Sequence, residues 1–433
     1  MNIVFMVGSY YPYSSAVGTC CLNIVEELSK ENNVTVICMK SRIDQSDVEE
    51  YRGHTVVRVS HRWWDIRMKI DEKIRTERGA SKLLFKFLLN GIRFKEYIKL
   101  ISSRASLQKS MIDAYYNALN KILAPVEAVI PMCFPMEAVV AGMKFKKNVT
   151  TTKLIPYLFD PFVESHTLHR AKWNKRLKRK ANLKVEKNMF DLSTKVFCVN
   201  HMLHHFDKFS NSHGRIISTE HPMLKENINN LTINREGENK APLILTYTGV
   251  FDKVVRNPDY LLKTMQFVLS DYDSELHLYT SGNCGDIIDP YTKEAEGKIV
   301  NHGYVSKKDA DIAVASSGIL VSVGNRDNLQ SPSKVFEYIS AGKPIVHFYN
   351  RDDDSIVDLL KSYPISLCLK QDKGLIEQNA KSIIKFYQEC NGKTLKFSEI
   401  EYKFRKASPK YIASQILNII IDKENENESK ELM

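Results

Sequence analysis

The chain lacks the cysteine pairs that disulfide scaffolds and structural zinc sites require. Its eight cysteines are scattered over 433 residues and none forms a CxxC pair, so no metal-ligand spacing can be identified. Several lie in apolar, strand-like runs, where a reduced cysteine packs as a small hydrophobic side chain. We therefore expect free thiols in a reducing cytosol and no bound metal.

Long apolar segments are also missing. No hydrophobic run attains the ~20 residues that a membrane-spanning helix needs. The first residues, MNIVFMV, have neither a basic leader nor a small-residue cleavage site, and they predict a first β-strand rather than a signal peptide. The expected location is therefore the cytoplasm.

What the chain does have is a large apolar fraction and an excess of positive charge. Hydrophobic residues make up 43% of the sequence, which is enough for packed cores and argues against disorder. At ~100–200 residues per domain, the length predicts two domains. Lysine and arginine outnumber aspartate and glutamate by 62 to 51, which suggests a nucleic acid, an anionic lipid or a phosphorylated substrate as partner.

Strand and helix patterns alternate along both halves of the chain, which predicts an α/β fold with two doubly wound parallel sheets. Ligands of such sheets bind beyond the carboxyl ends of the strands. The expected N-terminal domain spans residues 1–224, a polar linker 225–242, and the C-terminal domain 243–407. A helix at 408–423 is expected to pack back on the N-terminal domain, and residues 424–433 form a frayed tail. The expected strands are 3–7, 34–39, 55–60, 126–131, 152–158, 195–200, 215–218, 243–248, 275–280, 299–302, 319–323 and 344–349.

The most informative motif is QSPSKVFEYISAGKPIV at residues 330–346. Ser331 suits the N-cap of a helix, with Pro332 at its first position. The free N–H groups of Ser333 and Lys334, aided by the helix dipole, would then attract a pyrophosphate. Glu337, one turn later, could accept hydrogen bonds from two ribose hydroxyls. The alternative is an ordinary capped helix with a surface glutamate.

This pattern, PSK-xx-EY-xx-AGKP, resembles the C-terminal signature of glycosyltransferase family 4, whose members are retaining enzymes with the GT-B fold. The resemblance implies that Ser331, Ser333 and Lys334 lie at the donor diphosphate and that Glu337 holds the donor ribose. It also implies two Rossmann-like domains that face each other across a cleft. The family commonly has a second glutamate where this chain has Leu329, and Gln330 is the candidate to replace that contact with the sugar.

A second motif, LILTYTGVFDKVVRNP at residues 243–258, predicts a strand that ends in a turn at Gly249. Lys253 and Arg256 follow this turn, and arginine can bind two phosphate oxygens at once. The family's version of this loop has an arginine where this chain has Val250. We expect Arg256 and Lys253 to stabilise the departing diphosphate as catalytic groups, unless they are solvated loop charges.

Two further loops match the family more weakly. GSYYPYSSAVGT at residues 8–19 resembles its opening loop, in which Gly18 would permit close approach of the backbone to the donor. The loop is not a GxGxxG motif, so a dinucleotide cofactor is not expected. Tyr304 and Val305 follow the expected strand 299–302 and would contact the base. A plain βα turn and a short core strand are the respective alternatives.

Candidates for the acceptor side are few. Asp160 follows the strand expected at 152–158, where the family often has a polar residue that touches the transferred sugar, and it is the catalytic candidate of this half. A helix cap or a turn is the alternative role for Asp160. His166 and His169 are predicted to be surface residues, and His221 to be structural.

Two segments concentrate the basic charge. Residues 170–187 contain nine lysines and arginines with Glu186 as the single acid, and residues 62–109 include the run KLLFKFLL at 82–89. Basic helices with apolar side chains can lie on an anionic bilayer. We expect peripheral attachment to the inner face of the cytoplasmic membrane rather than binding to nucleic acid; a merely solvated face is the alternative.

The functional expectation is a retaining glycosyltransferase. It would use a nucleoside-diphosphate sugar, with UDP as the expected nucleotide, and require no metal or other cofactor. The acceptor would be a lipid-linked or oligosaccharide molecule in cell-surface polysaccharide assembly. Two alternatives remain open: a nucleotide-sugar epimerase on the same fold, and a non-catalytic nucleotide-binding partner, which the departures at Leu329 and Val250 would permit.

Overall fold

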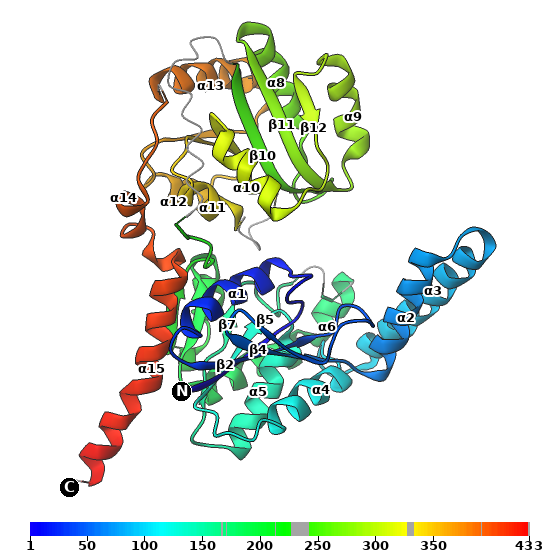
Figure 1. The fold of residues 1–433 in the computed structure, drawn as a ribbon, viewed down its shortest axis with the longest axis vertical. Helices are drawn as coiled ribbons and strands as arrows, with labels where there is room; N and C mark the ends of the chain where they lie inside the picture. Colours follow the sequence, from blue (N-terminus) through cyan, green and yellow to red (C-terminus); the bar gives the residue numbers. More distant parts are fainter. Residues whose placement is uncertain are drawn as a thin grey trace. The chain divides into compact units, whose positions relative to one another are not determined.

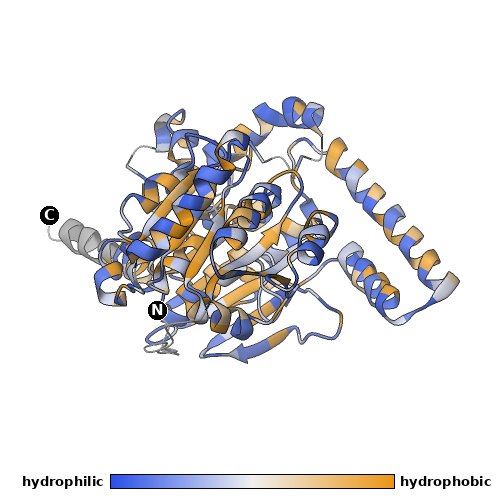
Figure 2. Ribbon diagram, turned by 90° about the horizontal axis from the view of Figure 1, so that it is seen from above, coloured by the Kyte–Doolittle hydropathy of each residue, from blue (hydrophilic) through white to orange (hydrophobic). Residues whose placement is uncertain are grey.

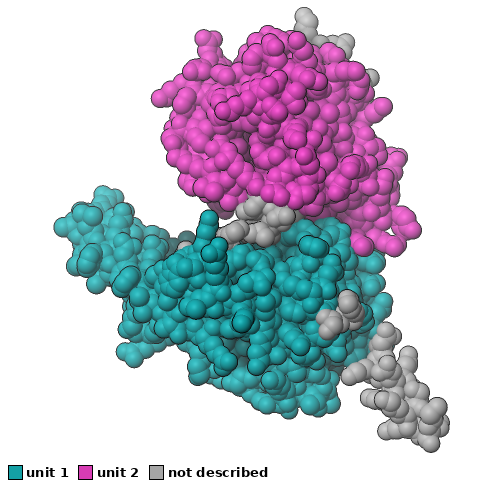
Figure 3. All heavy atoms as spheres, turned by 180° about the vertical axis from the view of Figure 1, so that it is seen from behind, with its two compact units in different colours: residues 1–222, 409–433 teal, residues 223–408 magenta. Residues whose placement is uncertain are grey.

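A computed structural model describes residues 1–165, 168, 169, 171–212, 214–226, 242–326, 333–390 and 392–431. The chain divides into two compact units (Figure 3). Unit 1 comprises Met1–Pro222 and Pro409–Met433, and unit 2 comprises Met223–Ser408. Each unit contains one sheet, parallel or nearly so, with connecting helices, so the expected α/β fold class is confirmed. None of the described helices is long and apolar enough to cross a membrane.

The sheet of unit 1 has the strand order β3-β4-β2-β1-β5-β7-β8-β9, with β6 paired to β5. Among the described strands of this sheet, only β3 is antiparallel to its neighbour, β4. The central strand β1 pairs with β2 through Ile3 and Val34 and with β5 through Ile3 and Ala128. The strand order therefore reverses at β1, whose carboxyl end is a topological switch point. The strands are β1 (Asn2–Val7), β2 (Asn33–Met39), β3 (Val48–Tyr51), β4 (His54–Val59), β5 (Ala128–Cys133), β6 (Lys153–Leu154), β7 (Tyr157–Leu158), β8 (Val196–Val199) and β9 (Ile216–Thr219).

Helices of unit 1 form two layers and an arm. α1 packs against α15, and α5 packs against both α4 and α6. α2 and α3 pack against each other as a helical hairpin that projects from the unit (Figure 1). α1 begins at Ala16, and α6 begins at Lys172. The helices are α1 (Ala16–Leu28), α2 (Arg62–Thr76), α3 (Gly79–Ser102), α4 (Lys109–Asn120), α5 (Met136–Asn148), α6 (Lys172–Leu192), α7 (Leu203–Phe206) and α15 (Pro409–Glu431).

The sheet of unit 2 has the order β12-β11-β10-β13-β14-β15, and all of its pairings are parallel. The order reverses between β10 and β13, so the loops after these two strands meet at the switch point. The strands are β10 (Leu243–Phe251), β11 (Ser274–Gly282), β12 (Ile299–Asn301), β13 (Ile319–Val323), β14 (Ile345–Tyr349) and β15 (Ser366–Lys370).

Helices cover both faces of this sheet, as its apolar strands require (Figure 2). Alternate residues of β10, from Leu243 to Tyr247, join a core with α8 and α13. Thr246 and Thr248 point to the opposite face, where α11 lies. The helices are α8 (Asp259–Asp271), α9 (Gly285–Glu294), α10 (Lys307–Ser316), α11 (Lys334–Ser340), α12 (Ser355–Leu360), α13 (Ile376–Cys390) and α14 (Phe397–Glu401).

One correction concerns the end of β10. The sequence predicted a strand that stops at Thr248 and a turn at Gly249, but β10 continues to Phe251 and stays paired with β11 as far as Gly282. Gly249 is therefore a strand residue, with φ +154°. The chain reverses between Asp252 and Arg256, whose backbone groups exchange hydrogen bonds of 3.0 and 2.9 Å. This short turn sets the position of the Arg256 side chain.

Candidate functional site

Arg256 lies at the switch point of the unit 2 sheet. Its Nε and Nη2 donate to Asn325 Oδ1 at 3.0 and 2.7 Å, and Asn325, in the loop after β13, is almost completely buried. The turn itself is shaped by Asp252, whose Oδ1 accepts from the N–H groups of Val254 and Val255. The two loops that flank the switch point are thus joined, and a guanidinium group is fixed between them.

Lys253 lies differently, although the sequence placed it with Arg256. Its Nζ forms an ion pair of 2.6 Å with Asp286 Oδ2, in the first turn of α9. The side chain of Lys253 is 44% exposed. Val250, at the position of the family's arginine, is also exposed. Of these two cations, Arg256 is therefore the one whose side chain joins the two loops.

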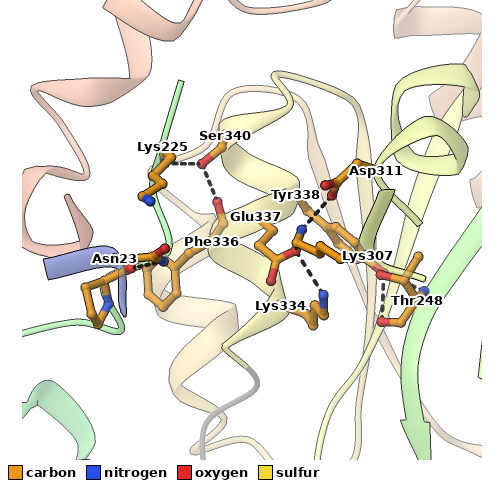
Figure 4. Close-up of polar contacts among 11 residues, drawn as sticks. Asn23, Lys225, Thr248, Lys307, Asp311, Lys334, Phe336, Glu337, Tyr338 and Ser340 are labelled. Carbon is orange, nitrogen blue, oxygen red and sulfur yellow. Dashed lines mark hydrogen bonds and ion pairs between the residues drawn. The ribbon is translucent and has the colours of Figure 1, made fainter. Parts of the chain in front are cut away.

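Glu337 lies on α11 and contacts two lysines through a single oxygen (Figure 4). Lys307 Nζ and Lys334 Nζ lie 2.8 and 2.9 Å from Glu337 Oε2. The Glu337 side chain is 15% exposed. Burial raises the pKa of this carboxyl, but the two lysines outweigh burial and hold the pKa below its ordinary value. Glu337 is therefore ionised near neutral pH.

Lys307 was not identified from the sequence. It is the first residue of α10, and it also pairs with Asp311 Oδ1 at 2.5 Å. The signal that could have located it is Ser306, which caps α10 by accepting from Asp309 N; a serine followed three residues later by an acid marks a helix start. That signal predicts where α10 begins but not what Lys307 contacts.

Contacts of α11 with its own unit fix the position of Glu337. Thr248 N, near the end of β10, donates to the hydroxyl of Tyr338 at 2.8 Å (Figure 4). Ser340 Oγ donates to Phe336 O and accepts from Lys225 N. Gly342 ends the helix as expected, with φ +65°; a Cβ at this position would lie 2.1 Å from Leu395 O.

The start of α11 differs from the expected helix start. The described helix begins at Lys334, with Ser333 at the N-cap and no side-chain cap hydrogen bond, whereas the sequence placed its first residue at Pro332. Leu329, Gln330, Ser331 and Pro332 lie outside the described residues. The Lys334 ammonium group points to Glu337.

The loop between β12 and α10 contains the two residues expected to contact the base. Tyr304 is 87% exposed and Val305 is partly buried. Gly303 N donates to Asn301 Oδ1 at 3.0 Å, which tightens the turn. The loop leads directly to Lys307, so the expected base contacts are close in sequence to the lysine that binds Glu337.

In unit 1, Gly18 lies inside α1 rather than in a loop. Its N–H donates to the N-cap Ser15 Oγ at 3.1 Å. A Cβ at Gly18 would lie 2.1 Å from Ser9 O. The absence of a side chain at Gly18 therefore lets the first turn of α1 approach the loop that follows β1.

Asp160 follows β7 by two residues and is partly buried. It lines a narrow crevice with Glu186 and six less polar side chains. Glu186 is buried, and it accepts from Val163 N at 3.1 Å and lies 2.9 Å from His205 Nε2. The Glu186–His205 pair was not foreseen, because Glu186 was taken as the lone acid of a basic surface.

Of the three histidines considered from the sequence, the structure describes His169 and His221. His169 is buried, which corrects its expected place on the surface; its Nδ1 lies 2.9 Å from Ser106 Oγ and its Nε2 lies 3.1 Å from two backbone carbonyls. His221 packs against Phe159, and burial lowers the pKa of its ring to about 3. His166 lies outside the described residues.

Several cations of the basic segment at 170–187 make contacts within unit 1. Lys178 is buried and donates to Leu100 O and Ser103 Oγ, so its expected exposure was wrong. Lys175 and Arg179 pair with Glu164. The exposed cations on α6 are Lys172, Arg176, Arg179, Lys180, Lys184 and Lys187.

Comparison with known proteins gives structural neighbours alone. No family model matches the chain, and no curated protein matches its sequence. A sucrose-phosphate synthase from Thermosynechococcus elongatus is similar over 100% of this chain and 99% of its own, with 10% identity and a TM-score of 0.57. A lipopolysaccharide outer core galactosyltransferase matches over 98% and 100%, with 11% identity and a TM-score of 0.55.

A third neighbour was solved with a nucleotide-sugar analogue. It is the E. coli structure described as trehalose-6-phosphate bound with UDP-2-fluoro glucose, which matches over 97% of this chain and 99% of its own, with 8% identity and a TM-score of 0.59. All three likenesses span both units. The chain therefore has the GT-B fold of glycosyltransferases, built from two Rossmann-like domains.

Proposed function

We propose that the protein is a retaining glycosyltransferase whose unit 2 binds a nucleoside-diphosphate sugar, with UDP as the nucleotide. The observation that carries the proposal is the set of charged groups at the carboxyl edge of the unit 2 sheet. Arg256 is fixed at the switch point by Asn325, and the ionised Glu337 is held by Lys307 and Lys334. Open α/β sheets bind their ligands at this edge.

The proposed roles follow from the charge that develops in the reaction. When the sugar leaves, a doubly negative diphosphate forms, and cations aimed at it stabilise the transition state. We assign this role to Arg256, with Lys253 as a weaker contributor, and to the backbone of Ser331, Ser333 and Lys334. Because both lysines contact Oε2, Oε1 of Glu337 would accept from the ribose hydroxyls.

The roles proposed for the remaining residues rest on the family resemblance. Gln330 would contact the transferred sugar, Tyr304 and Val305 the base, and Gly249 the diphosphate. In unit 1, Gly18 would let the backbone approach the donor, and Asp160 would touch the transferred sugar as a catalytic residue. Front-face attack with retention fits this set, and charge neutralisation by side chains removes the need for a metal.

The acceptor and its setting complete the proposal. A lipid-linked or oligosaccharide acceptor, used in cell-surface polysaccharide assembly at the inner face of the cytoplasmic membrane, accounts for the exposed cations of α6. One structural neighbour is named as a lipopolysaccharide galactosyltransferase. Each lysine or arginine near an anionic bilayer contributes ~1 kcal/mol of attraction.

Calorimetry with UDP, followed by a donor screen by mass spectrometry with membrane extract as acceptor, tests the proposal. Glu337→Ala should weaken UDP binding about ten-fold or more, since a lost contact to a charged group costs roughly 1.5–3 kcal/mol. The matched control is Glu275→Ala, which removes a partly buried carboxylate from β11. Binding without turnover of any donor would favour a non-catalytic partner, and conversion of the donor without acceptor an epimerase; unchanged UDP affinity in Glu337→Ala would refute the site.

A further inference from the structure

Helix α3 has two apolar faces, of which one is covered. Leu89 and Leu100 are buried and Ile92 is partly buried, on the side that packs against α2. At about 100° of rotation per residue, six further large apolar side chains fall on the opposite side. They are exposed by 68, 57, 75, 44, 65 and 48% at Leu83, Leu84, Phe87, Leu88, Phe94 and Ile98 respectively.

This uncovered face is large for a water-soluble surface. Monomeric proteins rarely expose contiguous apolar patches of more than a few hundred Å², and larger ones mark sites of interaction. The face runs along most of α3, in the arm that projects from unit 1 (Figures 1 and 2). A surface of this kind requires a partner.

Five cations accompany the apolar face on α3. By helical rotation, Lys95 and Lys99 fall beside Leu84 and Leu88 at one edge of this face, whereas Lys82, Lys86 and Arg93 fall nearer the side of α2. Lys95 Nζ and Lys99 Nζ lie 3.8 and 5.2 Å from the centroid of the Trp63 ring of α2. The one acid of α3, Glu96, is on the side of α2, where its carboxylate is 3.9 Å from Arg67.

We propose that α3 inserts its exposed apolar face into the surface of an anionic lipid bilayer. An exposed apolar face on a helix rich in lysine and arginine is the pattern of helices that lie in the membrane interface, where the apolar side chains enter the acyl region and the cations reach the phosphates. The inference rests on the proposed membrane setting and deepens it, because it names the inserting element. That element differs from the basic surface of α6.

Charge complementarity favours lipid over a second copy of the chain. A symmetric dimer through α3 would bring the same five cations of each copy together, with one acid each, and like charges oppose such an interface. An anionic bilayer attracts the same cations. The apolar residues alone would fit either occupant, so the excess of cations on α3, five against one acid, decides.

Flotation of the full-length protein with vesicles tests the proposal. We expect flotation with phosphatidylcholine vesicles that contain about 30 mol% phosphatidylglycerol, and weaker flotation with phosphatidylcholine alone or at high salt. The double variant Leu84→Gln, Phe87→Gln should bind the anionic vesicles at least about ten-fold more weakly. Both side chains are more than half exposed, so the fold should be retained.

Matched variants control for general loss of apolar surface and of charge. Leu123→Gln removes a fully exposed leucine outside the arm and should float as the wild type does. Lys82→Gln with Lys86→Gln should lose the preference for anionic vesicles, whereas Lys381→Gln with Lys403→Gln, at exposed positions of unit 2, should keep it. UDP calorimetry on every variant should be unchanged, which separates this inference from the proposed donor site.

Three results would overturn the proposal. The wild-type protein could remain at the bottom of the gradient with anionic vesicles, or the Leu84→Gln, Phe87→Gln variant could float undiminished. Alternatively, light scattering could find a wild-type dimer that this variant converts to a monomer while flotation stays the same, and a second copy of the chain would then be the occupant of α3.

Discussion

Arg256 and Lys253 are three residues apart, yet their surroundings predict different effects of mutation. Arg256 is held at the switch point by Asn325, whereas Lys253 pairs with Asp286. Arg256→Ala should therefore reduce UDP affinity and donor turnover about ten-fold or more, the cost of a lost charged contact of roughly 1.5–3 kcal/mol. Lys253→Ala should change both by less than about three-fold, since exposed ion pairs contribute ~0–1 kcal/mol.

Steady-state kinetics and UDP calorimetry on both variants measure this difference. A loss of turnover with unchanged UDP affinity in Arg256→Ala would place the guanidinium in transition-state stabilisation alone. If the two variants were equally impaired, the distinction between the two cations would be wrong.

Lys307 predicts a pH effect on nucleotide binding. The two lysines hold the pKa of Glu337 below its ordinary value, against the effect of burial. In Lys307→Met one cation is lost, so the pKa of Glu337 rises. The carboxylate then becomes protonated at a higher pH and, in the role proposed for it, can no longer accept from both ribose hydroxyls. As the pH is lowered, UDP affinity should therefore begin to fall at a higher pH in the variant than in the wild type.

The measurement is the UDP dissociation constant from about pH 5 to pH 8, with acetate and phosphate buffers matched in ionic strength. Lys308→Met is the control, because Lys308 is the exposed neighbour of Lys307. Its profile should coincide with that of the wild type. Parallel profiles for Lys307→Met and the wild type would show that Lys307 does not act through Glu337.

At the scale of elements, the attachment of α11 to β10 depends on the hydroxyl of Tyr338. This buried group accepts from Thr248 N at 2.8 Å, and burial raises its pKa well above the ordinary value. Tyr338→Phe leaves a buried N–H without this partner, which costs about 1–3 kcal/mol. The free energy of unfolding of unit 2 and UDP affinity should both fall.

Urea denaturation with a probe in unit 2, together with UDP calorimetry, tests this effect. Tyr402→Phe removes the same hydroxyl from a side chain that is 77% exposed and should leave both quantities unchanged. Lower stability with normal UDP affinity would mean that α11 keeps its position without the Tyr338 hydroxyl.

The elements that could be predicted from the sequence are those buried on both faces. The strand expected at 319–323 is found as β13 (Ile319–Val323), because five consecutive buried residues give an unbroken apolar run. β3 (Val48–Tyr51) was missed because its sequence, VEEY, is mostly polar and partly exposed. The turn Arg52-Gly53, with positive φ at both residues, was the hairpin signal for β3.

The site could be predicted as far as local motifs extend. Glu337 and Gly342 were identified from one window because capping, turn and helix signals are local. Lys307 is 30 residues from Glu337, and Lys178 is 78 residues from the carbonyl of Leu100 that it binds. Such partners are brought together by the topology, which a charge count cannot reveal.

At the scale of the molecule, unit 1 is built from both ends of the chain. α15 packs against α1, and Lys153 Nζ donates to the carbonyls of Ile419 and Ile420. Ile412 and Ile416 of α15 are completely buried. A chain that ends at Ser408 would therefore expose an apolar surface of unit 1 while the sheet of unit 2 stays complete.

This division predicts two separable thermal responses. Removal of residues 409–433 should lower the unfolding temperature of unit 1, since burial of two isoleucines alone contributes about 3–6 kcal/mol. Saturating UDP should raise the unfolding temperature of unit 2 alone. At a concentration of 100 times the dissociation constant, binding adds about 2.7 kcal/mol to the free energy of unfolding of that unit. Differential scanning calorimetry of the full-length and shortened chains, each with and without UDP, measures both effects. If the shortened chain lost its response to UDP, the donor site would depend on unit 1, and its assignment to Arg256, Lys334 and Glu337 would be incomplete.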